Sequence, residues 1–197
     1  MELSCSEAEL WAAALAGEGE AFAAVFDMHR DRVYRHALRL VANVHDAEDV
    51  TAGAFLELWR RRRSVRLVEG STLAWLLVTT TNLSRNMARS LRRYRAFLAF
   101  LPRSGMAPGA GEAAFERVEE AATAERVREA LGSLAAPDSA LIALTAFEGY
   151  SPAQAAAALG ISDGAARARL HRARAKLASA LGTSPGAMAP VANKEAT

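Results

Sequence analysis

The fold is decided near the carboxyl end of the sequence, where residues 149–176 read GYSPAQAAAALGISDGAARARLHRARAK. Two runs rich in alanine, leucine and arginine, all good helix formers, flank a glycine-containing turn at Gly160. The second run carries five arginines and lysines between Arg167 and Lys176. A short helix, a turn and a cation-rich helix are typical of a helix-turn-helix, whose second helix lies in the major groove of DNA. The other side of that second helix is expected to be core: Leu170, Ala173 and Leu177.

The composition predicts a soluble chain without metal or cofactor. It has 197 residues, 51% of them hydrophobic, and no apolar run reaches the roughly 20 residues that a bilayer span requires. The acidic start of the chain lacks the basic and apolar stretches of an export signal, so we expect a cytoplasmic protein with no membrane insertion of its own. Cys5 is the single cysteine and the four histidines are scattered. Neither an internal disulfide nor a zinc site is therefore expected.

Helix-forming residues dominate nearly the whole sequence, and no alternating run of β-branched residues is bounded by turn signals. The clearest interruption is residues 101–111, which hold two prolines and three glycines. We therefore predict an all-α fold with two small helical domains, residues 1–99 and 117–182. A flexible linker over residues 100–116 would join them, and residues 183–197 would form a disordered tail.

Charge is segregated along the chain, although the net charge is only +2. Residues 1–59 hold eleven acidic residues against four arginines, whereas residues 60–103 hold eleven arginines against one glutamate. Residues 104–136 are acidic again, and residues 137–197 are basic. This alternation favours an acidic face for a basic partner and two basic faces for nucleic acid. A solvated surface is the alternative for any single block, and a G+C-rich genome would also explain the preference for arginine.

A helix is predicted from Asp46 to Trp59. Asp46 can cap this helix. Glu48 and Asp49 would then lie in its first turn, where the helix dipole favours acids, so capping explains these acids by itself. Gly53 lies inside the helix and costs about 1 kcal/mol relative to alanine. The helix ends in four consecutive arginines, residues 60–63, which is more positive charge than its C-terminal dipole needs.

A longer helix is predicted from Ser71. Apolar residues at helical spacing form its expected core side: Leu76, Leu83, Met87, Leu91, Tyr94 and Leu98. An amide and four guanidinium groups recur along its other side: Asn82, Arg85, Arg89, Arg92 and Arg93. No acid interrupts this stretch between Ser71 and Gly111, whereas a solvated helix face usually mixes charges of both signs. We therefore predict nucleic-acid contact along the stripe.

Three groups of motifs occur in a characteristic order: Asp46–Val50 with Phe55–Trp59, then Ala74–Leu76 with Asn82-Leu83, then residues 149–174. In this order they resemble the extracytoplasmic-function (ECF) sigma factors, the smallest sigma subunits of bacterial RNA polymerase. The resemblance runs from about Glu7 to Leu181. It implies a protein that is not an enzyme and that directs promoter recognition and transcription initiation at a specific regulon. Core RNA polymerase, promoter DNA and an anti-sigma factor are the implied partners.

The resemblance also implies three binding surfaces. One would dock on core polymerase: Asp46, Glu48, Asp49, Leu56 and Trp59. A second would contact the minus-ten element and hold its separated strand: Arg60, Arg61, Arg62, Arg63, Arg66, Trp75, Asn82, Arg85, Arg89, Arg92 and Arg93. The third would read the minus-thirty-five element: Ser162, Asp163, Arg167, Arg169, His171, Arg172, Arg174 and Lys176. For a helix of this pitch the last set cannot all face the groove, so it divides between bases and phosphates.

The sequence departs from the family pattern at three places. Residues 51–54 replace a polar pair of the family, Val78 and Thr81 stand where many members have basic residues, and three alanines thin the hydrogen bonding of the reading helix: Ala165, Ala166 and Ala168. Two other functions stay open, a stand-alone helix-turn-helix regulator and a sigma-like decoy for an anti-sigma protein. The basic region over residues 60–93 favours the sigma factor over a simple regulator, which has no use for a second basic domain around an exposed Trp75.

Overall fold

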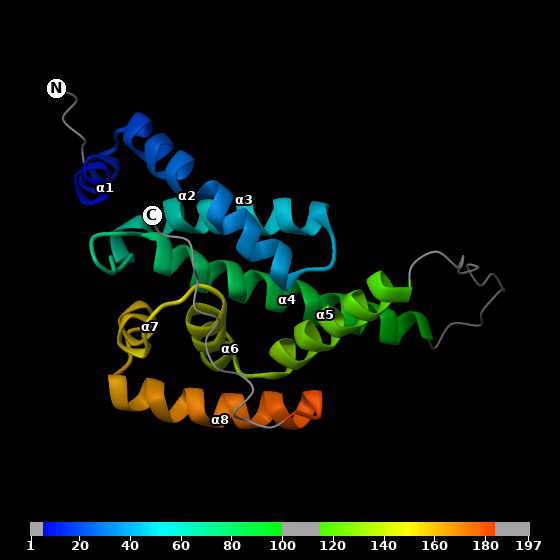
Figure 1. Cartoon of the computed structure of the whole chain (residues 1–197). Helices are drawn as coiled ribbons and strands as arrows, with labels where there is room; N and C mark the ends of the chain where they lie inside the picture. Colours follow the sequence, from blue (N-terminus) through cyan, green and yellow to red (C-terminus); the bar gives the residue numbers. More distant parts are fainter. Residues whose placement is uncertain (1–5, 100–114, 184–197) are drawn as a thin grey trace.

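The computed structural model describes residues 6–99 and 115–183. Within these ranges every regular element is a helix (Figure 1). The predicted all-α fold is therefore confirmed. Most of the predicted linker and all but the first residue of the predicted tail lie outside the described residues. The last two residues assigned to the linker, 115 and 116, already belong to a helix.

The first unit contains four helices: α1 (Glu7–Ala16), α2 (Gly19–Leu40), α3 (Val44–Arg60) and α4 (Leu73–Ala99). A 3₁₀ turn, η1 (Arg62–Ser64), follows α3. Helices α2, α3 and α4 pack against one another, and α1 packs on α2. The periodic apolar side chains meet in the centre, where Val25, Val33, Leu58, Leu76 and Leu77 are fully buried.

Helix α3 begins two residues before the predicted start, and Asp46 does not cap it. Asn43 is the cap: its side-chain oxygen accepts a hydrogen bond from the Asp46 backbone N–H at 2.8 Å. The Asp46 carboxylate in turn accepts a bond from Asn43 Nδ2 at 2.8 Å. Because the helix begins at Val44, Glu48 and Asp49 lie beyond its first turn, and capping does not explain these two acids.

Helix α4 is buried over its first half and exposed over its second. Three residues expected in the core are exposed, namely Leu91 (40%), Tyr94 (59%) and Leu98 (41%). The prediction failed because helical spacing continues along α4 past the part against which α2 and α3 pack, and periodicity reports a face but not what covers it. Figure 1 shows this second half, in green, extending beyond α3.

The second unit contains α5 (Phe115–Ser133), α6 (Ala136–Ile142), the π-helical turn η2 (Ala143–Phe147), α7 (Pro152–Leu159) and α8 (Asp163–Leu181). Ser151 and Gln154 form a capping box at the start of α7. Gly160 ends α7 with φ +65°, a left-handed conformation that suits glycine, and Ser162 caps α8. The predicted helix-turn-helix is thus α7, the turn and α8, and its expected core residues are buried: Leu170, Ala173 and Leu177.

The two units pack against each other. Helices α6, η2 and α7 lie along α4, and α5 crosses its second half (Figure 1). Buried apolar side chains of both units form one continuous cluster, which includes Leu77 of the first unit and Leu144 of the second. The α8 helix lies on the far side of the second unit, away from α3 (Figure 1).

Candidate nucleic-acid interface

The outer face of α3 carries the acids that the sequence analysis assigned to polymerase docking. Residues spaced by three or four along the helix are exposed together: His45, Glu48, Asp49, Ala52, Leu56 and Arg60. Leu56 stands out because 55% of it is exposed although leucine is usually buried. Glu48 pairs loosely with His45, at 3.6 Å in a fully solvated position. An apolar side chain with acids beside it on one free face is suited to binding another protein.

The other two residues assigned to docking have structural contacts of their own. Asp46 is half-buried and holds Asn43, as described above. Trp59 is half-buried, with its ring packed edge-on against Phe22 at 5.0 Å and under the Arg62 guanidinium at 4.2 Å. Among the five candidates, only Glu48, Asp49 and Leu56 therefore lie on the free face.

Gly53, a departure from the family pattern, has a packing role. A Cβ atom added there would lie 3.3 Å from Leu83 Cδ1 of α4. Helices α3 and α4 pack closely at this point, so the missing side chain allows that approach. The cost in helix propensity is offset by packing.

The basic segment after α3 is exposed, with internal pairing for some of its arginines. Arg60 and Arg61 approach Glu57 at 3.6 and 2.8 Å, and all three are on the surface or half-exposed. Such pairs contribute little to stability and exchange readily with other anions. Arg62 is more firmly held, since it also donates a hydrogen bond to the Trp59 carbonyl at 2.9 Å. Arg63 and Arg66 are exposed.

Arg66 lies against the helix-turn-helix in this structure. A Cβ atom added at Gly160 would come within 2.6 Å of Arg66 Nη1, which shows how close the side chain lies to the turn. Trp75, expected to be exposed, is half-buried and packs against the shared apolar cluster. The expectation was wrong because the second unit covers this part of the first.

The predicted stripe on α4 is divided by the same packing. The Arg85 guanidinium donates two hydrogen bonds to the Leu134 carbonyl, at 2.9 and 2.5 Å, and Arg92 donates one to the Gly132 carbonyl at 3.4 Å. These carbonyls lie at the C-terminal end of α5, where the helix dipole attracts cations. Arg89 and Arg93 are exposed, and Arg92 is exposed as well apart from this one contact.

Two further details mark this stripe as a place where anions are favoured. Partial burial and the positive charges of Arg89 and Arg92 lower the pKa of the Arg85 guanidinium. Mutual repulsion of this kind is relieved when an anion such as phosphate binds. Asn82 is half-buried, and its side-chain oxygen has no hydrogen-bond partner within the described part of the chain.

The outer face of α8 is freely exposed. Cationic and ring side chains at spacings of four, one and four share it: Arg167, His171, Arg172 and Lys176. Arg169 points elsewhere and pairs with Asp138 of α6 at 3.0 Å, and Arg174 is half-buried. Ser162 caps the helix by accepting a hydrogen bond from the Ala165 N–H, while Asp163 is exposed in its first turn. The predicted reading set therefore separates into a four-residue face, two flanking arginines, the cap Ser162 and the exposed first-turn acid Asp163.

The structure also brings together residues to which the sequence analysis gave no role. Arg32, His36 and Arg39 of α2 surround Glu148, which follows η2 more than a hundred residues later. These hydrogen bonds and ion pairs join α2 of the first unit to the second unit. No local pattern could have indicated them, because their relation exists only after both units have packed.

A helix-turn-helix with a free cationic face, joined to a second arginine-rich helical unit, defines a DNA-binding protein of the transcription-factor class. Residues 25–94 match the family described as Sigma-70 region 2, and residues 124–177 match Sigma-70, region 4. The match to region 2 covers α3 and most of α4, and the match to region 4 covers the helix-turn-helix and most of α8.

Individual relatives agree with this assignment. The chain is 30% identical to ECF RNA polymerase sigma factor SigL of Mycobacterium tuberculosis over 164 residues, or 81% of this chain and 88% of SigL. It is 35% identical to ECF sigma factor SigE of Mycolicibacterium smegmatis over 150 residues, which cover 76% of this chain but 57% of SigE. The solved structure of CnrH in complex with the cytosolic domain of CnrY is 28% identical, with a TM-score of 0.55 over 89% of this chain and 97% of CnrH.

The chain belongs to the ECF RNA polymerase sigma factors. The predicted function, a sigma factor that directs transcription initiation, is confirmed at the level of the family. Sigma factors are not enzymes, which is consistent with the prediction of no catalytic activity. In the described part of the chain, no helix combines the length and the apolar character that crossing a bilayer would need.

Proposed function

We propose that this sigma factor docks on core RNA polymerase through the outer face of α3 and contacts promoter DNA with two separate arginine surfaces. The observation that carries the proposal is that one chain presents all three: an acidic face around an exposed leucine, a basic segment leading into α4, and a cationic face on α8. A simple DNA-binding regulator needs only the last of these.

The α3 face fits a protein partner better than it fits nucleic acid. Leu56 would supply the apolar anchor, and Glu48 and Asp49 would meet basic side chains of the polymerase at the rim. Burial of an exposed leucine contributes about 1.5–3 kcal/mol, whereas acids at the rim mainly guide association and set orientation. Asp46 and Trp59 would act indirectly, by holding the two ends of the helix in shape.

The basic segment and α4 fit the minus-ten element. Exposed guanidinium groups at Arg63, Arg89 and Arg93 would contact phosphates, and Arg66, which lies against the turn at Gly160, would do so once the second unit moves away. Opening of the duplex then needs no catalytic side chain. Preferential binding of the separated strand shifts the equilibrium, and unstacking a base costs a few kcal/mol that phosphate contacts and stacking offset. Trp75 is half-buried in the apolar cluster that both units share, so its contact with DNA requires the second unit to move away; Asn82 is half-buried as well.

The outer face of α8 fits the minus-thirty-five element. Arg167, His171, Arg172 and Lys176 are the side chains that would enter or border the major groove. Arg169 and Arg174 would contact the phosphates on either side. Ser162 would order the start of the helix rather than read a base, since its hydroxyl already serves as the cap.

The family also leads us to propose that an anti-sigma factor controls this chain, and that the chain acts in the cytoplasm, where RNA polymerase works.

The substitution Asp49→Arg tests the docking step. The substitution should weaken the complex with core polymerase about tenfold or more, because it places a cation where the partner is basic. Asp27→Arg on α2, also an exposed acid, is the matched control. Affinity is measured by titrating core polymerase with labelled full-length protein.

Three outcomes separate the candidate functions. Loss of core affinity in Asp49→Arg alone, with promoter-dependent transcription lost in parallel, supports docking through α3. No complex between the unmodified chain and core polymerase at moderate salt removes the sigma-factor mechanism and leaves a stand-alone regulator. A chain that binds core polymerase but never starts transcription on any template would behave as a decoy.

A further inference from the structure

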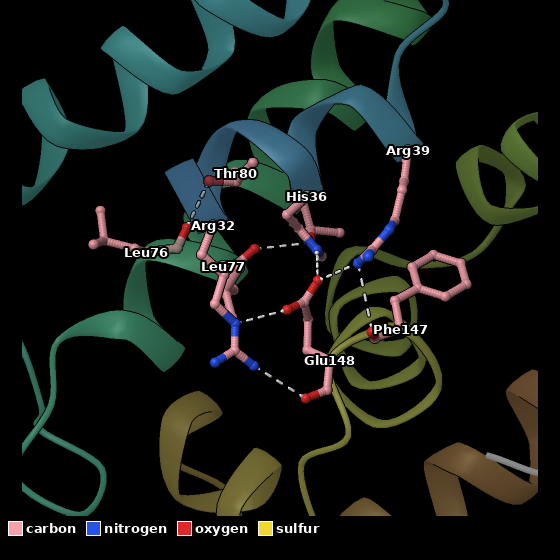
Figure 2. A network of polar contacts seen from close by, with 9 residues as sticks. Arg32, His36, Arg39, Leu76, Leu77, Thr80, Phe147 and Glu148 are labelled. Carbon is pink, nitrogen blue, oxygen red and sulfur yellow. Dashed lines mark hydrogen bonds and ion pairs between the residues drawn. The ribbon is translucent and has the colours of Figure 1, made fainter. Parts of the chain in front are cut away.

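The contact between the two units encloses one buried carboxylate, that of Glu148. Only 4% of its side chain is exposed, and it lies between η2 and α7, just before the helix-turn-helix. Figure 2 shows this side chain pointing out of the second unit toward three basic side chains, Arg32, His36 and Arg39, that all come from α2 of the first. A buried carboxylate is tolerated only where charges and hydrogen bonds compensate it.

Three side chains of α2 provide that compensation. Arg39 Nη1 and His36 Nδ1 lie 2.8 and 2.9 Å from Glu148 Oε1, and Arg32 Nε lies 3.1 Å from Oε2. Arg32 also donates to the Glu148 backbone carbonyl at 3.3 Å. Burial alone would raise the pKa of Glu148, but the hydrogen bonds and charges of His36, Arg32 and Arg39 outweigh it and lower the pKa, so the carboxylate is ionised at neutral pH.

The His36 ring is held from both sides. Its Nδ1 lies 2.9 Å from Glu148 Oε1, and its Nε2 lies 3.0 Å from the Thr81 hydroxyl of α4. That hydroxyl also lies 2.8 Å from the Leu77 carbonyl. Glu148 thus faces two arginines and a fully buried histidine of the first unit, and α4 helps to fix the histidine through Thr81.

The same packing covers part of the α4 stripe. Arg85 and Arg92 donate to the carbonyls of Leu134 and Gly132, which belong to the second unit. Arg66 lies against the turn at Gly160. A DNA strand that uses these guanidinium groups competes directly with the second unit for the same donors.

We propose that Glu148 is a latch that holds the free protein in a closed state in which part of its own DNA surface is occupied. The inference rests on the proposed function, because the masked residues are those assigned to the minus-ten element. Buried ion pairs gain little net free energy, since their attraction is set against the hydration they give up. The latch is therefore weak enough to open when polymerase and DNA bind. The geometry of Glu148 with Arg32, His36 and Arg39 nevertheless selects one closed arrangement of the two units.

The test compares Glu148→Gln with the unmodified chain in two measurements. Donor and acceptor dyes are placed on Ala52→Cys in α3 and Ala175→Cys in α8, both exposed positions, in a full-length chain that also carries Cys5→Ser. Glutamine keeps the shape of the side chain but removes the negative charge that Arg32 and Arg39 pair with. We expect a lower energy-transfer efficiency and about tenfold tighter binding of a labelled oligothymidine, because the open fraction rises by that factor.

The controls separate the latch from a general change of charge. Asp31→Asn removes the same charge from an exposed acid on α2 and should change neither measurement. Arg39→Gln, whose side chain is 51% exposed, should act in the same direction as Glu148→Gln with less risk to folding. Helical content from circular dichroism confirms that each variant is folded.

Two results would overturn the proposal. Unchanged energy transfer in both Glu148→Gln and Arg39→Gln would show that the closed state does not depend on the carboxylate. Lower transfer without tighter oligothymidine binding would show that closure masks no DNA surface. Both measurements omit RNA polymerase, so a chain that fails to bind core polymerase would refute the proposed function and leave the result on the latch in place.

Discussion

Two arginine-bearing helices, α8 and α4, look alike in sequence and differ in the structure. On α8 the cations at Arg167, Arg172 and Lys176 are free on the outer face. On α4, Arg85 and Arg92 are already bound to backbone carbonyls of the other unit. Sequence charge therefore marks both helices as candidate DNA surfaces, but only packing decides which guanidinium groups are available in the free protein.

The two helices are also positioned by different means. Ser162, the residue just before α8, caps its start. The first residues of α4 are held from α1, since Glu7 Oε1 accepts hydrogen bonds from the Thr72 backbone N–H at 2.6 Å and from the Thr72 hydroxyl at 2.7 Å. A carboxylate at a helix N-terminus is favoured by the dipole. The α8 surface is thus locally determined, whereas the α4 surface depends on contacts across the whole fold.

Removing the Glu7 carboxylate, which holds the start of α4 from α1, should have the largest effect on stability. Burial alone would raise the pKa of Glu7, but hydrogen bonds from His29, Ser71 and Thr72 lower it from 4.5 to about 2. A pKa lowered by that much corresponds to at most about 3.4 kcal/mol of stability at neutral pH, and solvent near this half-buried carboxylate reduces the expected value to about 2–3 kcal/mol. We expect Glu7→Gln to lose about that much free energy of unfolding in urea titrations, while Glu18→Gln, at an exposed position, changes little.

The acid dependence checks the cause. Because the folded-state pKa lies below the ordinary value, the contribution of Glu7 is complete above pH 4.5 and disappears as the pH falls toward 2. The stability difference between the unmodified chain and Glu7→Gln should therefore shrink over that range. A difference that stays constant down to pH 2 would mean that packing, and not the charge, holds α1 on α4.

A second prediction sharpens the contrast within the free surface of α8. Arg172→Ala should weaken binding to minus-thirty-five DNA by about 1–3 kcal/mol if Arg172 contacts a base. Arg169→Ala should cost less, because Arg169 already pairs with Asp138 and lies on the flank. Fluorescence anisotropy with matched and scrambled duplexes measures both. If each variant lost as much affinity for the scrambled duplex as for the matched duplex, both arginines would contact phosphates and not bases.

This difference between the helices explains how much could be predicted. The helix-turn-helix is readable from sequence because its signals are local: the capping serines, the glycine with positive φ and the apolar side of α8. The acidic face of α3 is readable for the same reason, although Asn43 rather than Asp46 proved to be the cap. Helical periodicity also located α4 but extended its core too far, to Leu98.

The relation between the two units could not be predicted. Glu148 and Arg32 are 116 residues apart in sequence, and their ion pair has no periodic or compositional signature. The same holds for Arg85 and Leu134, which are 49 residues apart. Contacts of this kind depend on the complementarity of two assembled surfaces, so they appear only when both units are folded and packed.

The smallest expected effect distinguishes covered from free arginines on α4 itself. Arg89→Ala removes a free cation and should weaken oligothymidine binding by the free chain about threefold. The dependence of log affinity on log salt concentration should also become shallower by about one.

Arg85→Ala removes a covered cation together with its bonds to Leu134. In the free chain the lost phosphate contact is therefore offset by easier separation of the two units. In the polymerase complex, where the proposed opening separates the units, both variants should lose affinity alike. Equal losses already in the free chain would mean that the carbonyls of α5 do not compete with DNA.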